Sequence, residues 1–151
     1  MIFRQMTTED LAYHQKHALY PEDRKIHVGQ SEYNFSLVDG DVVLGIAGFR
    51  FINNTTAWCW LSMGENAKEH LTISFRTLSE WIGGFKGDAG QWVPGFCETY
   101  GIRRLEAYVE LGFEAGVKLV EHLGFVEESR MPNFIGELPA IRFVRFFKEQ
   151  K

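Results

Sequence analysis

The feature that most limits the possible folds of this chain is a strand-helix-strand unit near its C-terminus. Arg103 to Val109 has the composition of a strand, and Phe113 to His122 carries apolar residues at helical spacing. In the sequence Leu123-Gly124-Phe125, the glycine predicts the end of that helix, because glycine readily adopts the left-handed conformation that closes helices. A strand from Phe125 to Arg130 follows. This unit predicts a sheet in which some strands run parallel.

The preceding part of the chain predicts an antiparallel meander. Asp39-Gly40 is a hairpin signal, and Asn53-Asn54 marks a second turn. These turns separate three predicted strands, at residues 33–38, 42–51 and 56–63. A helix follows, with apolar residues at helical spacing from Leu71 to Ile82, and Gly83-Gly84 closes it. A meander that leads into a strand-helix-strand unit predicts a mixed sheet.

The N-terminus predicts one short strand and two helices. Met1 to Met6 alternates as a strand does, and Thr7 or Thr8 then caps a helix that runs to about Leu19. A second, short helix is predicted from Arg24 to Val28. The remaining predictions are a loop with one helical turn at 85–101 and a last strand at 141–147. The predicted order is β-α-α-β-β-β-α-β-α-β-β, in a single α/β domain spanning residues 1–151.

Composition narrows the possible functions. The net charge of −4 gives no reason to expect binding to nucleic acid or to a membrane surface. Cys59 and Cys97 lack metal or redox spacing, so we expect a reduced cytoplasmic protein without a metal site. Cys59 is predicted as a small core residue. The sequence leaves open whether Cys97 and Tyr100 in the loop face a cleft. We expect the five dispersed histidines to be solvated: His14, His17, His27, His70 and His122.

Two segments of the chain resemble the GNAT (N-acetyltransferase-like) superfamily. Met1 to Leu11 resembles its opening strand and capped helix, and Arg103 to Arg130 resembles its fifth strand and fourth helix with the closing Leu-Gly-Phe. The predicted order of elements matches that of the superfamily. More narrowly, the aromatic strand and helix from Trp58 to Trp81 resemble the GNAT-like proteins of tailed phages related to internal virion protein A.

The resemblance implies an acetyl-CoA site where the fourth strand meets the next helix. In the family, a loop of the form Arg/Gln-x-x-Gly-x-Gly/Ala presents backbone amides to the pyrophosphate, helped by the helix dipole. The corresponding cofactor residues here are Met63, Gly64, Asn66, Ala67 and Lys68. The loop has one glycine and neither Arg nor Gln. Asn66 and Glu69 have the spacing of a capping box, which predicts an ordinary capped helix at this point.

Charge in this loop opposes an anionic ligand. Glu65 and Glu69 place carboxylates beside the predicted pyrophosphate position, and each opposes phosphate binding by on the order of 1 kcal/mol. Lys68 and His70 offset this repulsion only in part. The fourth helix also departs from the family pattern: Phe113 stands where a cofactor-contacting Asn is usual, and Val120 stands where the family places a Tyr that protonates the thiolate.

A base for acetyl transfer is expected near the fifth strand. Glu106 and Glu110 are the candidate catalytic residues, with Glu98 in the preceding loop, although carboxylates on strands more often face solvent. Two hypotheses follow. The chain is a phage-encoded GNAT-like protein with a degraded acetyl-CoA site, acting through protein contacts in the virion or the host cytoplasm. Alternatively, it is an active acetyl-CoA-dependent N-acetyltransferase that acts on a small amine or a protein lysine.

Overall fold

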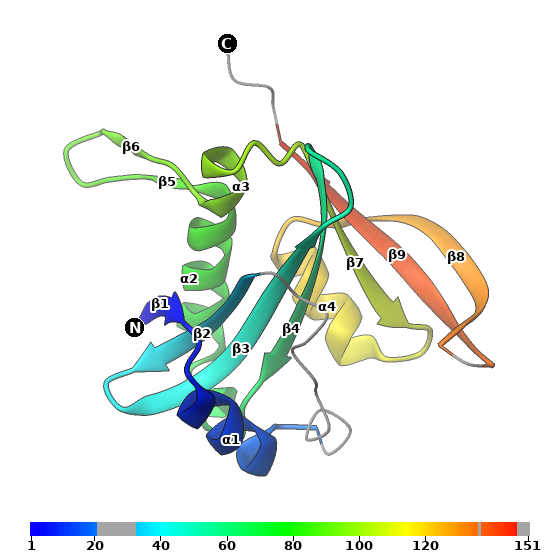
Figure 1. Ribbon diagram of the computed structural model, residues 1–151, viewed down its shortest axis with the longest axis horizontal. Coiled ribbons are helices and arrows are strands. Elements are labelled where there is room, and N and C mark those ends of the chain that lie inside the picture. The colour runs from blue at the N-terminus through cyan, green and yellow to red at the C-terminus, as the bar shows by residue number, and fades with distance from the viewer. Residues whose placement is uncertain (21–32, 136, 148–151) are drawn as a thin grey trace. The chain divides into compact units, whose positions relative to one another are not determined.

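A computed structural model describes residues 1–20, 33–135 and 137–147 (Figure 1). The chain divides into two compact units. Unit 1 comprises Met1–Arg50 and Cys59–Leu78, and unit 2 comprises Phe51–Trp58 and Ser79–Lys151. The second helix predicted at 24–28 lies outside the described residues. Among the residues that are described, no helix is both long and apolar enough to cross a membrane.

Unit 1 contains the predicted meander. Strand β1 (Ile2–Gln5) pairs antiparallel with β2 (Tyr33–Asp39), which pairs antiparallel with β3 (Val42–Phe51). Gly40, with a φ of 60°, makes the turn between β2 and β3, as the Asp39-Gly40 signal predicts. Strand β4 (Thr56–Met63) is the next neighbour of β3. The centre of the unit is apolar, with Leu37, Leu44, Ile46 and Phe49 fully buried.

A glycine in β3 is explained by an aromatic side chain of β4. A Cβ atom at Gly48 would lie 2.3 Å from Nε1 of Trp60, so the indole occupies the space that a side chain at this position would need. The close approach of β3 and β4 therefore requires glycine at this position. Trp60 in turn packs against the apolar cluster formed by Val38, Val43 and Ile46.

Helix α1 (Thr8–His17) is capped by Thr7. The Thr7 hydroxyl accepts from the amide of Asp10, and the Asp10 carboxylate accepts from the amide of Thr7 at 2.9 Å. This is a complete capping box, which decides between the two threonines that the sequence offers. A short 3-10 helix, η2 (Glu65–Glu69), follows β4 and precedes helix α2 (Leu71–Gly83). Helix α2 begins in unit 1 and ends in unit 2.

Unit 2 carries the parallel pairing that the sequence predicts. The first residues of β4, Thr56 to Trp58, pair in parallel with β7 (Arg104–Glu110). Strand β7 pairs antiparallel with β9 (Leu138–Phe146), which pairs antiparallel with β8 (Val126–Ile135). The strand order is β1-β2-β3-β4-β7-β9-β8. The mixed, mostly antiparallel sheet is therefore confirmed.

The strand-helix-strand unit has the predicted form. Helix α4 (Glu114–His122) follows β7, and Gly124 closes it with a φ of 87°. The Phe125 amide donates to the carbonyl of Val120, which satisfies one of the last carbonyls of the helix. Leu123 and Phe125 are both buried. A Cβ at Gly116 of α4 would lie 2.9 Å from a methyl of Val109, so this face of β7 packs against α4.

The segment between α2 and β7 is more ordered than predicted. The expected helical turn is present as α3 (Phe96–Thr99). It is preceded by a small antiparallel hairpin of β5 (Phe85–Lys86) and β6 (Trp92–Val93), which the sequence analysis treated as loop. The rings of Trp81 and Phe96 stack with their centroids 5.0 Å apart. This tertiary contact is not visible in local sequence patterns.

The last two strands are longer than predicted. Strand β8 continues to Ile135 instead of ending at Arg130, and β9 begins at Leu138 instead of Ile141. The added residues include Pro132 and Pro139, although proline disfavours strand interiors. Strand β8 is at the edge of the sheet, where proline is tolerated, and its register shifts between Met131 and Ile135.

Candidate functional site

The predicted cofactor residues form one short segment of unit 1. Met63 is the last residue of β4, and Gly64 is the N-cap of η2. Met63, Gly64 and Ala67 are buried, whereas Asn66 and Lys68 are exposed. We call residues 62–70 the β4–η2 segment. The structure therefore brings these five residues together, but on a 3-10 turn and not at the start of an α-helix.

Gly64 has a structural role in this segment. Its amide donates to the carbonyl of Leu44 on β3 at 2.7 Å. A Cβ at Gly64 would lie 3.2 Å from the same carbonyl oxygen, closer than side chains normally approach. The glycine therefore permits a close approach of the segment to β3. Its amide is already hydrogen-bonded within the protein.

The predicted capping box at Asn66 and Glu69 is wrong. Both residues lie inside η2, and the Asn66 side chain donates to the Tyr13 hydroxyl on α1 at 2.6 Å. Helix α2 begins only at Leu71, where the amide of Ser74 donates to the carbonyl of His70. The spacing of Asn66 and Glu69 resembled a cap because a 3-10 turn also begins near this point.

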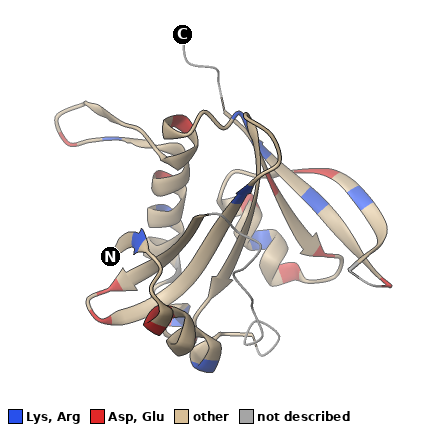
Figure 2. Ribbon diagram, viewed as in Figure 1, with Lys and Arg blue, Asp and Glu red and all other residues tan. Residues whose placement is uncertain are grey.

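Helix α2 begins at Leu71, which is not one of the predicted cofactor residues. By helix geometry, its first amides lack intrahelical acceptors, so its first turn is where the fold would hold an anion. Leu71 is also the first residue of the apolar helical repeat, and this repeat predicts where the helix begins. Around it, Glu65, Lys68, Glu69 and His70 are all exposed, and Figure 2 marks the charged positions along the chain.

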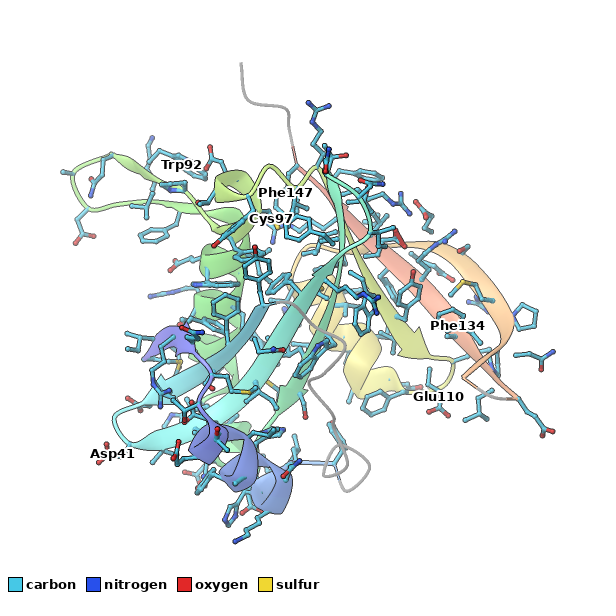
Figure 3. All side chains as sticks on the ribbon, in the orientation of Figure 1. Asp41, Trp92, Cys97, Glu110, Phe134 and Phe147 are labelled. Carbon is cyan, nitrogen blue, oxygen red and sulfur yellow. The ribbon has the colours of Figure 1, made fainter. Side chains whose placement is uncertain are left out.

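The two candidate bases lie on one strand, β7, but in different surroundings. Glu106 is buried, which corrects the expectation that such carboxylates face solvent. Glu110 is exposed at the end of the strand, where Figure 3 labels it. Four residues separate them, or roughly 13 Å along an extended strand. The structure therefore does not bring the two carboxylates together.

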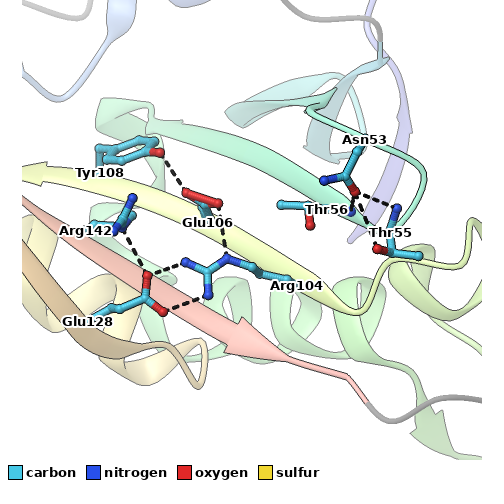
Figure 4. A network of polar contacts seen from close by, with 8 residues as sticks. All are labelled: Asn53, Thr55, Thr56, Arg104, Glu106, Tyr108, Glu128 and Arg142. Carbon is cyan, nitrogen blue, oxygen red and sulfur yellow. Dashed lines mark hydrogen bonds and ion pairs between the residues drawn. The ribbon is translucent and has the colours of Figure 1, made fainter.

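Glu106 is part of a polar network that spans three strands of unit 2 (Figure 4). Its two oxygens accept from the Tyr108 hydroxyl at 2.8 Å and from Nε of Arg104 at 3.2 Å. The Arg104 guanidinium also forms a two-point ion pair with Glu128 on β8, with Nη1 to Oε2 at 2.7 Å. Arg142 on β9 lies with Nε 3.1 Å from Oε1 of Glu128. We call these five residues the β7 network.

Contacts within the β7 network shift the pKa values of three of its members. The hydrogen bond with Glu128 is the main cause that raises the pKa of Arg104, and the same contact from Arg104 lowers the pKa of Glu128. Burial, followed by the hydrogen bond with Glu106, raises the pKa of Tyr108. Both oxygens of Glu106 are engaged, so proton transfer to this carboxylate would compete with an arginine and a tyrosine.

Sequence reasoning missed most of the β7 network. Arg104, Glu106 and Tyr108 alternate along β7, so they share one face of the sheet opposite the buried Leu105, Ala107 and Val109. That alternation was a readable signal for three of the five residues. The other two, Glu128 and Arg142, come from strands whose register with β7 is set by the fold, so local patterns do not reveal them.

Helix α4 is built from packing residues at the two positions where the family has functional ones. Phe113 is its N-cap and makes no side-chain capping bond. A Cβ at Gly116 would lie 2.7 Å from the Phe113 ring, so the ring covers the first turn of α4. Val120 lies on the buried face of the helix. Neither side chain carries a group that exchanges protons or accepts hydrogen bonds.

His14 of unit 1 is fully buried, with 1% of its surface exposed, so the prediction that it is solvated is wrong. Its Nε2 lies 2.8 Å from the Ser62 hydroxyl on β4, and the buried Nδ1 has no hydrogen-bond partner in the described part of the chain. Burial lowers the pKa of His14 to about 4. The His14 side chain lies on the face of α1 that meets the sheet. The polarity of histidine alone does not indicate which face of a helix it occupies.

The structure decides what the sequence left open for Cys97. Cys97 is fully buried, and burial raises the pKa of its thiol to about 12, with nearby Arg145 opposing. Tyr100 is exposed and packs on Phe96 with ring centroids 4.5 Å apart. Cys59 is half-buried. Among the described residues, no group of three or more His, Cys, Asp or Glu is arranged to hold a metal ion.

Comparison with known proteins gives matches in structure only. No protein-family model matches the sequence, and a search of curated proteins returns no match. Among solved structures, Ard1 from Thermoplasma volcanium matches with a TM-score of 0.71 at 12% identity, covering 97% of each chain. A chimera of the spermidine N-acetyltransferase SpeG from Vibrio cholerae matches with a TM-score of 0.68 at 15% identity, covering 97% of this chain and 96% of that one.

A third match has a ligand in its structure. It is yncA, a putative acetyltransferase from Salmonella typhimurium with its cofactor acetyl-CoA, with a TM-score of 0.66 at 17% identity. The match covers 100% of this chain and 96% of that one. At such identities these likenesses establish the architecture and not the activity. The chain therefore has the GNAT, or N-acetyltransferase-like, fold over its whole length.

Proposed function

We propose that this GNAT-fold protein has a degraded acetyl-CoA site and acts through protein contacts. The observation that carries the proposal is the structure of the β4–η2 segment. Where the family presents free amides of a glycine-rich loop, this chain has a 3-10 turn, and the amide of Gly64 donates to Leu44. The exposed carboxylates of Glu65 and Glu69 flank the turn and oppose a diphosphate. These residues do not fit the cofactor.

Two further observations support the proposal. Val120 is buried at the position where the family resemblance places a proton donor, and a valine donates no proton. Glu106, the buried candidate base, has both oxygens engaged by Arg104 and Tyr108. Each of these residues has a packing or network role that accounts for it without catalysis.

Two exposed apolar side chains, one on β8 and one on β9, lie on the same face of the sheet as the β7 network. They support a role in protein contacts. Val126 pairs with Val144, and Phe146 lies two residues further along β9, so Val126 and Phe146 share a face of the sheet. They are 57% and 63% exposed. The Arg104 guanidinium lies over the Phe146 ring at 5.7 Å from its centroid. Aromatic and arginine side chains of this kind are enriched in protein interfaces.

The finer proposal concerns the origin of the chain. The Trp58–Trp81 segment, which resembles phage GNAT-like proteins related to internal virion protein A, leads us to propose a phage-encoded accessory protein. Such a protein would be packaged in the virion or would act in the host cytoplasm. Mass spectrometry of purified virions would distinguish the two locations.

A thermal-shift experiment with CoA and acetyl-CoA tests the central proposal. A ligand at one hundred times its dissociation constant adds about 2.7 kcal/mol of stability. For a chain of this length, that corresponds to a rise in melting temperature of roughly 5–11 °C. We expect no rise up to millimolar CoA, whereas yncA measured in parallel shows what a bound cofactor does. A clear rise together with acetyl transfer to an amine would establish the alternative, an active N-acetyltransferase.

A further inference from the structure

Three side-chain contacts and two backbone contacts hold the C-terminal half of helix α1 on the β4–η2 segment. Tyr13 accepts from Asn66, His14 bonds Ser62, and His17 bonds Glu65 with Nδ1 2.7 Å from Oε1. The Leu19 amide donates to the carbonyl of Met63 at 2.9 Å, and Ala18 forms an isolated antiparallel bridge with Gly64. We call these contacts the α1 clasp.

His14 is the buried centre of the α1 clasp. Its Nε2 forms one hydrogen bond with the Ser62 hydroxyl, as donor or acceptor according to the tautomer. Ser62 is itself 2% exposed. Nδ1 has no partner. A neutral imidazole needs only one donor and one acceptor site, whereas an imidazolium has two donors and carries a charge. The described residues thus leave one nitrogen of even the neutral ring without a partner, and they offer no acceptor to a second ring proton.

Among the residues that the structure describes, no carboxylate is hydrogen-bonded to His14. Helix α1 hydrogen-bonds to the hydroxyls of Ser36 on β2 and Ser62 on β4. Its Leu11 and Tyr13 pack against the apolar cluster of Val38, Val43 and Ile46. Asp10, one turn earlier on α1, is held by Arg4, Thr7 and Ser36. Burial is the sole cause that lowers the pKa of His14, with no charged group contributing. Protonation of His14 thus places an unbalanced charge in the interior.

The other histidine of the clasp is near the surface. His17 and Glu65 are 40% and 50% exposed, so their contact is screened by solvent. Exposed contacts of this kind contribute little to stability. The buried His14 is therefore the member of the clasp on which a charge would cost most.

We infer that the α1 clasp is an acid-sensitive device, in which a proton taken up by His14 releases helix α1 from the β4–η2 segment. In the released state the ring reaches water and carries its charge there, so acid shifts the population toward release. The inference does not depend on the proposed function, since it concerns contacts within unit 1 alone. It predicts that the apolar surface under α1 becomes exposed as the pH falls toward 5.

Hydrogen exchange measured at pH 7.5 and pH 5.0, corrected for intrinsic exchange rates, tests the inference. With a folded pKa of about 4 against an ordinary value of 6.5, the opening constant of α1 amides should rise about thirtyfold. Amides of β9 that exchange by local fluctuations, with opening free energies below the global free energy of unfolding, should keep their protection because the release of α1 is local. A rise below about threefold in α1, or an equal rise in these β9 amides, would overturn the inference.

Variants identify the responsible residue. His14→Gln keeps a polar group beside Ser62 but does not titrate, so its α1 opening should not change between the two pH values. The matched control His17→Gln should keep the full rise. If His14→Gln retains the rise, the inference is wrong. If that variant does not fold, the wild-type ring gives the answer by NMR, since a His14 that titrates near pH 6.5 contradicts the inference.

Discussion

At the scale of single residues, Glu106 shows how a candidate base becomes a structural group. Its carboxylate is buried and accepts from Arg104 and Tyr108. We expect Glu106→Gln to lower the free energy of unfolding by about 2 kcal/mol, because hydrogen bonds to a charged group are lost. The matched control, Glu110→Gln at the exposed end of β7, should stay within about 0.5 kcal/mol. Urea unfolding measures both, and equal effects would contradict the network.

Gly48 is a second test at this scale. A Cβ there would lie 2.3 Å from the Trp60 indole, so we expect Gly48→Ala to destabilise the protein by about 1–3 kcal/mol. Combining it with Trp60→Phe, which removes the clashing part of the ring, should restore part of the loss. A double-mutant cycle in urea reads the coupling. Additive effects would show that Trp60 does not occupy the space over Gly48.

At the scale of elements, α1 provides a direct test of the capping assignment. Thr7 and Asp10 form the reciprocal capping box, whereas Thr8 is the first helical residue. Thr7→Ala should cost about 1 kcal/mol of stability. Thr8→Ala, the neighbouring control, should change it by less than about 0.5 kcal/mol. The opposite ranking of the two variants would place the cap at Thr8.

The elements also show what the sequence could predict. Long periodic segments, such as α2 and the β7–α4 unit, were predicted because their apolar spacing and closing glycines are local signals. Helix η2 and the β5–β6 hairpin were not, since they depend on contacts between distant residues, such as Gly64 with Leu44 and Trp81 with Phe96. The helix start predicted at Asn66 was misplaced for the same reason, since α2 begins at Leu71.

At the scale of the whole molecule, stability should depend on pH through His14 and Asp10. The folded pKa of His14, about 4, is below the ordinary 6.5, so the unfolded chain binds more protons between these values. The free energy of unfolding should therefore fall by about 2 kcal/mol from pH 7.5 to pH 5. Urea unfolding at each pH measures this fall. His14→Gln should remove it, and an undiminished fall in the variant would contradict the assignment.

Asp10 should act at lower pH. Burial opposes its ionisation, but hydrogen bonds from Arg4, Thr7 and Ser36 outweigh burial and lower its pKa below 3.8. The stability that this ionised group contributes is present above its unfolded pKa and is lost as the pH falls through the folded value. A second decline in stability below about pH 4 is therefore expected, and it should persist in His14→Gln.

The architecture of the molecule was more predictable than its candidate site. The order of strands and helices follows from local patterns, and the solved GNAT-fold structures confirm the fold over the whole chain. The buried states of Glu106 and His14 did not follow, because they depend on strand pairing and on which face of α1 meets the sheet. The fold alone does not decide between catalysis and protein contacts.

Calorimetric titration of the protein with acetyl-CoA tests the central claim most directly. The turn at Gly64 and the carboxylates of Glu65 and Glu69 predict no saturable heat up to about 1 mM ligand, where even a weak site would contribute about 4 kcal/mol of binding free energy. A one-site isotherm with a dissociation constant below about 100 μM would contradict the claim that the acetyl-CoA site is degraded.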